Sequence, residues 1–156
     1  MGLKVRITNL NTSYRINERA FRRISSHVFK HFPRIDPASL EIVFLTNAQI
    51  KILNKKYKGE PRPTDVLSFD LSEALYGSEG LLGSIFISID KALENSKIFN
   101  TSFAEELTLY VIHGILHLAG YDDEYPAERA RMEKRQKRIL GYICKRENLS
   151  KVLTPR

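Results

Sequence analysis

The stretch HGILHLAGYDD, from His113 to Asp123, organises the rest of the chain. It places two histidines four residues apart near the end of an apolar run, and a glycine and a cluster of acids follow. Residues i and i+4 project from the same face of an α-helix, so a helix over Ser102–Ala119 directs His113 and His117 into one small volume. Gly120 then ends the helix, because glycine readily adopts the left-handed backbone of a C-terminal turn.

A carboxylate in the turn after this helix can complete a three-ligand metal site. A chain that reverses at Gly120 brings Asp123 back toward the two imidazoles, and Asp122, Glu124 and Glu128 are alternatives for the third ligand. Two imidazoles and one carboxylate leave a position open for water, whose pKa zinc lowers toward ~7. The same donors form the facial triad of non-haem iron. We therefore predict a divalent metal ion, with zinc ranked first; the alternative is that the histidines are ordinary core residues.

The same stretch resembles the signature H-G-x-L-H-L-x-G-Y-D-H of the YbeY family, bacterial single-strand-specific endoribonucleases of ribosomal RNA maturation. A second stretch, LNKKYKGEPRPTDVLSF from Leu53 to Phe69, resembles the family segment L-N-x-x-Y-R-G-x-x-x-P-T-D-V-L-S-F. Asp123 stands where the family has its third metal-binding histidine, Lys58 where it usually has arginine, and Ser84 where many members have aspartate. The resemblance implies a small mixed sheet packed with helices, and a zinc site for RNA cleavage.

Further residues are predicted to surround this reaction centre. By resemblance, the predicted catalytic residues are His113, Lys58 and Arg62: Lys58 keeps the positive charge of the family arginine but lacks its bidentate fork, and Arg62 is a candidate to replace it. The alternative for both cations is an ordinary solvated loop. We expect Glu106 and Asp122 to contact the metal ligands rather than the metal itself.

The second stretch, Leu53 to Phe69, carries three more polar candidates. Thr64 and Asp65 are expected to fix the loop through local hydrogen bonds, because Thr and Asp side chains readily bond nearby backbone groups. Ser68 is expected to face the side of its strand that approaches the cleft. His27 and His31 are also four residues apart, but we interpret them as residues at the boundary of the core rather than as ligands.

Composition indicates one globular domain with an anionic partner. The 156 residues include 25 Lys and Arg against 18 Asp and Glu, a net charge of +7. No apolar run approaches the ~20 residues of a membrane span, no secretory signal opens the chain, and Cys144 is the single cysteine, so we expect a cytoplasmic location. With the resemblance, the expected partners are single-stranded RNA, ribosomal RNA and the small ribosomal subunit, with no membrane and no DNA.

Hydrophobic periodicity predicts an α/β (α+β) domain over residues 1–148 and a flexible tail over 149–156. We expect a small mixed four-stranded sheet with about five helices and the metal site at the end of a central helix. The predicted strands are Lys4–Thr8, Leu40–Leu45, Asp65–Leu71 and Leu81–Ile89. The predicted helices begin at the caps Asn17, Asn47, Asp90 and Ser102 and at Pro126; Pro33 and Pro37 break the first of them, and Ser72–Gly80 is a surface connection.

Two other functions compete with an endoribonuclease. A zinc peptidase of the H-E-x-x-H type carries its general base directly after the first histidine, where this chain has Gly114. The second competitor is a non-catalytic RNA-binding ribosome assembly factor whose metal site is structural or vestigial. The departures from the family pattern at Lys58 and Asp123 favour the assembly factor over an active nuclease. The sequence leaves both the assembly factor and the peptidase open as alternatives.

Overall fold

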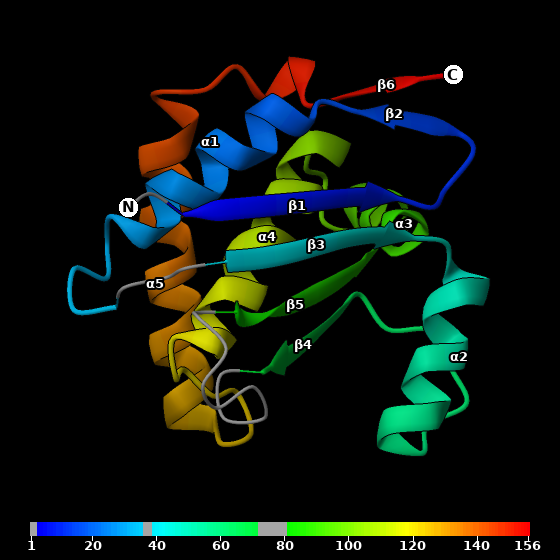
Figure 1. Ribbon diagram of the computed structural model, residues 1–156, viewed down its shortest axis with the longest axis horizontal. Coiled ribbons are helices and arrows are strands. Elements are labelled where there is room, and N and C mark those ends of the chain that lie inside the picture. The colour runs from blue at the N-terminus through cyan, green and yellow to red at the C-terminus, as the bar shows by residue number, and fades with distance from the viewer. Residues whose placement is uncertain (1–2, 36–38, 72–80) are drawn as a thin grey trace.

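The computed structural model describes residues 3–35, 39–71 and 81–156, and a four-stranded sheet forms its centre (Figure 1). The strand order is β1–β3–β5–β4. The strands β1 (Lys4–Asn9), β3 (Ser39–Leu45) and β5 (Leu81–Ser88) are parallel, and β4 (Val66–Asp70) pairs antiparallel with β5. The predicted mixed sheet is therefore confirmed. Pro37 and the predicted connection Ser72–Gly80 lie outside the described residues.

Within the described residues the sheet is packed with five α-helices, as predicted. Their bounds are α1 (Glu18–Phe29), α2 (Asn47–Lys58), α3 (Ile89–Ile98), α4 (Phe103–Leu118) and α5 (Pro126–Cys144). None of the described helices combines the length and the apolar character that crossing a bilayer requires.

The helices divide between the two faces of the sheet because side chains alternate along each strand. Leu40, Ile42 and Phe44 of β3 join the main core with α1, α4 and α5, whereas Val43 and Leu45 pack with α2 in a smaller cluster on the other face. In Figure 1, α4 crosses behind the strands and α2 stands apart at one end of the sheet. The helix with the two histidines is thus the central one.

Helix α4 approaches the sheet at a glycine. A Cβ atom added at Gly114 would lie 2.6 Å from Cγ2 of Ile85 on β5, which is closer than real Cβ contacts come. The hydroxyl of Ser68 on β4 donates to the Gly114 carbonyl at 3.3 Å, so Ser68 faces α4 between the two histidine turns. Only glycine permits this close contact of helix and sheet.

Residues 149–156, for which the sequence predicted a flexible tail, include two short regular elements in the structure. They form a short 3-10 turn, η1 (Leu149–Lys151), and a strand, β6 (Leu153–Pro155), that pairs antiparallel with β2 (Tyr14–Ile16). Val152 between them is fully buried against the main core. A three-residue strand is too short to show a periodicity, and its partner lies at the opposite end of the chain.

Candidate metal centre

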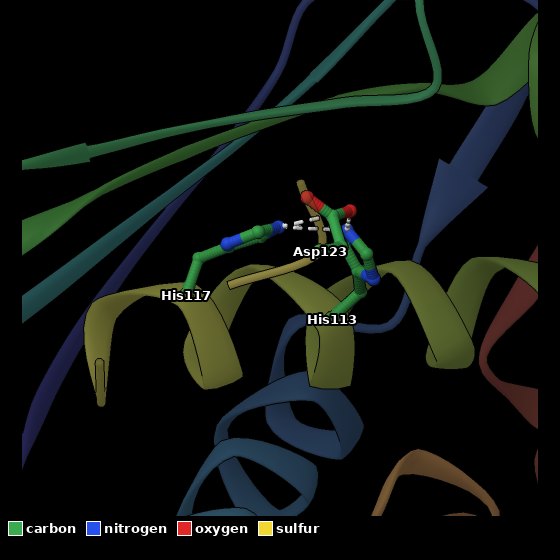
Figure 2. A group of neighbouring side chains, drawn as sticks. All are labelled: His113, His117 and Asp123. Atoms are coloured by element: carbon green, nitrogen blue, oxygen red, sulfur yellow. Dashed lines mark hydrogen bonds and ion pairs between the residues drawn. The ribbon is translucent and has the colours of Figure 1, made fainter. Parts of the chain in front are cut away.

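His113, His117 and Asp123 converge on one point, and we call them the metal-binding cluster (Figure 2). The Nε2 atoms of the two histidines lie 3.0 Å apart, and each lies 3.5 Å from Oδ2 of Asp123. The histidines come from successive turns of α4, and the carboxylate comes from the loop that follows. All three side chains are partly exposed, so solvent and substrate can reach the cluster.

Hydrogen bonds on the far side of each ring hold both Nε2 atoms ready for a cation. His113 Nδ1 faces the side-chain oxygen of Gln136 on α5 at 2.5 Å, and His117 Nδ1 faces the backbone carbonyl of Tyr121 at 3.0 Å. A carbonyl oxygen only accepts, so these contacts favour the tautomer with the proton on Nδ1 and a lone pair on Nε2. Two lone pairs at 3.0 Å repel each other unless a proton or a metal ion lies between them.

The spacing of the donor atoms fits a tetrahedral metal ion. With bonds of about 2.0–2.1 Å, tetrahedral geometry places any two ligand atoms about 3.3–3.4 Å apart. The three observed separations, 3.0, 3.5 and 3.5 Å, bracket this value. The donor set of two imidazoles and one carboxylate is also one that zinc accepts in catalytic sites. The cluster can therefore hold a metal ion with a fourth position left for water or substrate.

The chain reversal that supplies Asp123 is built from the helix end. Gly120 has φ +101°, and the amides of Gly120 and Tyr121 donate to the carbonyls of His117 and Leu116, the two bonds of a Schellman motif. Asp122 then accepts hydrogen bonds from the backbone amides of the two residues that follow it. The role of Asp122 is thus to shape the loop that carries Asp123, and it makes no hydrogen bond with either imidazole among the described residues.

The protonation of His117 favours metal binding. Burial of the ring lowers its pKa below the usual value, and the neighbouring His113 lowers it further, while the carboxylates of Asp123 and Asp122 partly offset this. A lowered pKa keeps the imidazole neutral near pH 7, which is the form that binds a metal.

Among the described residues, Glu106 forms no hydrogen bond with either histidine. Its side chain is buried two helical turns before His113, where it accepts a hydrogen bond from the Thr101 hydroxyl at 2.7 Å. The acceptor for His113 is Gln136, which the sequence reasoning missed. Gln136 is 8% exposed and interrupts the apolar stripe of Met132, Ile139 and Ile143 on α5. A lone amide within a buried stripe was the signal that could have identified it.

The two predicted phosphate-binding cations lie on a separate segment. Lys58 is in the last turn of α2, and the exposed Arg62 has its Nε 3.5 Å from Glu60 Oε2. Among the described residues neither cation forms a hydrogen bond or ion pair with the metal-binding cluster. The loop around them is nevertheless fixed, because Asn54 donates to the Arg62 carbonyl at 2.9 Å and the Asp65 carboxylate accepts from the amide of Val66 at 2.8 Å.

The remaining histidine pair sits between α1 and α5. His27 Nε2 lies 3.3 Å from a carboxylate oxygen of Glu147, and His31 Nδ1 bonds the His27 carbonyl at 3.0 Å. The rings of His31 and Tyr142 also pack edge-on, with their centroids 4.8 Å apart. These contacts join the two helices, in keeping with a position at the boundary of the core.

Comparison with known proteins identifies relatives over most of the chain. The family model described as Endoribonuclease YbeY matches residues 6–143. Endoribonuclease YbeY of Alkaliphilus oremlandii (strain OhILAs) is 41% identical over 107 residues, which are 67% of this chain and 71% of the relative. The same-named protein of Limosilactobacillus reuteri (strain DSM 20016) is 38% identical over 136 residues, 78% of this chain and 84% of the relative.

A solved structure is similar as well. The solution structure of TM1509 from Thermotoga maritima matches with a TM-score of 0.62 and 30% sequence identity, covering 89% of this chain and 88% of that one.

Proposed function

The chain belongs to the YbeY family of endoribonucleases, and from this membership and the metal-binding cluster we propose that it is a metal-dependent endoribonuclease specific for single-stranded RNA. The proposed biological role is maturation of small-subunit ribosomal RNA and ribosome quality control in the cytoplasm. The proposed partners are single-stranded ribosomal RNA and the small ribosomal subunit, and the proposed ion is zinc.

The observation that carries this proposal is the convergence of His113, His117 and Asp123, with an oxygen acceptor facing the Nδ1 atom of each histidine. A bound zinc ion supplies an activated water and a Lewis acid for a phosphoryl oxygen. The protein itself contributes orientation: Gln136 and the Tyr121 carbonyl hold the Nδ1 protons, and Asp122 holds the loop. The carboxylate of Asp123 replaces a neutral imidazole of the family and favours retention of a divalent cation.

The cations at Lys58 and Arg62 are proposed to bind the RNA backbone. Both side chains are exposed: Lys58 is at a helix end, and within the described part of the chain the ion pair of Arg62 is a solvent-exposed one with Glu60. Phosphate contacts of this kind position RNA without reading its sequence. Their expected contribution is to substrate affinity rather than to the chemical step.

A peptidase is disfavoured by the packing at Gly114. The general base of H-E-x-x-H enzymes would stand at this position, but a Cβ atom here would meet Ile85 at 2.6 Å. No glutamate fits between α4 and β5 without displacing the sheet. The site therefore lacks both the base and the room for it.

A cleavage assay separates the nuclease from a non-catalytic assembly factor. Zinc-loaded protein is incubated with an end-labelled single-stranded RNA, the same RNA annealed to its complement, and a DNA of the same sequence. We expect cleavage of the single strand alone, lost in His117→Ala and retained in His31→Ala, a matched histidine variant in the turn after α1. Salt-sensitive RNA binding without cleavage would overturn the enzymatic proposal in favour of the assembly factor.

A further inference from the structure

A cavity of 490 Å³ adjoins the metal-binding cluster. His113 and its acceptor Gln136 form part of its wall, and the rest comes from α3, α4, α5 and the start of β4. Cavities of 300–1,000 Å³ that combine apolar walls with a few fixed polar groups are typical small-molecule sites. Anything that enters this one lies next to the proposed reaction centre.

The walls combine apolar side chains with a buried carboxylate. Leu109 and Leu140 line the cavity, and Phe99 at the end of α3 is 64% exposed, although aromatic rings are usually buried. Inside, Glu106 and Tyr110 are each only 5% exposed. Asn95 donates to the Tyr110 hydroxyl at 2.6 Å, so the phenol is already held in place.

Glu106 is the polar group with bonding capacity to spare. Its Oε1 accepts from Thr101 at 2.7 Å, and a carboxylate offers about four acceptor sites. Burial raises the pKa of Tyr110 and the hydrogen bond from Asn95 lowers it, while the carboxylates of Asp65 and Glu106 raise it, Glu106 partly through a hydrogen bond with the phenol. A buried acceptor with free lone pairs favours a ligand that donates hydrogen bonds.

The charge of the lining disfavours a phosphate. Four carboxylates line the cavity, and the one lysine, Lys137, can offset only one of them; the acids are Asp65, Glu105, Glu106 and Glu133. Anionic RNA backbone is repelled here, whereas a base can enter, because its faces are apolar and its edge can carry amino groups. Bases of single-stranded RNA stack on exposed aromatic rings and are read along their Watson–Crick edges.

We propose that this cavity binds one unpaired base beside the scissile phosphate and that Glu106 selects bases with an exocyclic amino group over uracil. The inference rests on the proposed nuclease function and adds a base preference to it. Cytosine presents an amino donor at position 4, where uracil presents a carbonyl oxygen that a carboxylate repels. Phe99 stacks on the base, and only an unpaired base has its edge free for Glu106.

The test compares two oligouridine RNAs that differ in one central residue, cytidine or uridine. Binding is measured by fluorescence anisotropy on chelator-treated protein, which cannot cleave, and cleavage is mapped on the zinc-loaded protein. We expect about tenfold tighter binding and tenfold faster cleavage at the cytidine, the discrimination typical of one well-formed base contact. Glu106→Gln should bring the cytidine-to-uridine ratio to about one, while Glu94→Gln, an exposed carboxylate outside the cavity, should leave it at ten.

The outcomes distinguish the two proposals. Cleavage with equal binding of the two RNAs would overturn the base pocket and leave the nuclease intact. A tenfold binding preference without any cleavage would support the pocket and overturn the nuclease. Should Glu106→Gln fail to fold, Phe99→Ala provides a second test, because Phe99 is exposed and its truncation leaves the core intact. Loss of stacking in this variant is expected to weaken binding of both RNAs at least fivefold. Unchanged binding would overturn the proposal.

Discussion

Replacing Gln136 with alanine tests whether the metal-binding cluster depends on its hydrogen-bond partners. The side-chain oxygen of Gln136 is 2.5 Å from His113 Nδ1, and the residue is 8% exposed, so little water can replace it. Its removal leaves the Nδ1 proton without an acceptor and frees the ring to rotate. Loss of such a partner typically weakens metal binding by about 10–100-fold, which corresponds to about 1.4–2.8 kcal/mol.

The assay is competition for zinc with a chromogenic chelator at pH 7.5. Gln136→Glu keeps an acceptor of the same length and is expected to bind zinc at least as tightly as the unmodified protein. Gln49→Ala, which removes a glutamine from the distant capping box of α2, should leave zinc affinity unchanged. If Gln136→Ala binds zinc within twofold of the unmodified protein, the role assigned to Gln136 is refuted. If Gln136→Glu loses as much zinc affinity as Gln136→Ala, the effect is due to packing and not to the hydrogen bond.

Three further predictions concern stability. Gly114→Ala is expected to lower the free energy of unfolding by about 1–3 kcal/mol through its clash with Ile85. Gly141→Ala on α5, where the new Cβ meets nothing within 4 Å, should raise the free energy of unfolding by about 0.5–1 kcal/mol. Urea titration measures both changes, and a change of the same sign in the two variants would contradict the packing argument. Val152→Ala should cost about 1–2 kcal/mol by the same measurement, because two buried carbon atoms are lost, and no change would indicate a loosely held terminus. The pKa of His117 is lowered in the folded protein, so the unfolded chain binds a proton on this histidine more readily than the folded chain does. Metal-free protein should therefore lose stability as pH falls below about 6.5. A free energy of unfolding that stays constant from pH 8 to 5.5 would disprove this.

The sequence predicted the main elements because their signals are local. The run from Leu107 to Leu118 and the cap at Ser102 predicted α4, and the Ser102 hydroxyl accepts from the Glu105 amide at 3.0 Å. The predicted cap Asp90 was wrong: Ser88 caps α3, and the Asp90 carboxylate instead accepts from the backbone amide of Asn47 at the start of α2. That contact joins residues 43 positions apart, and no local pattern reveals it.

The candidate site shows the same division between local and distant contacts. The i, i+4 spacing and the glycine turn place His113, His117 and Asp123 together through short-range geometry alone. Gln136 reaches His113 from another helix, so its role emerges only from the packing of α4 against α5. Glu106 shares a helical face with the histidines but lies two turns from His113, and its described hydrogen-bond partner is Thr101, just before the helix begins.

Metal content measured by elemental mass spectrometry tests the central claim most directly. Protein purified without chelators is expected to carry about one divalent ion per chain, and His113→Ala, purified identically and shown to be folded, is expected to carry none. A folded protein without metal, or a variant that retains its ion, would contradict a metal centre formed by His113, His117 and Asp123.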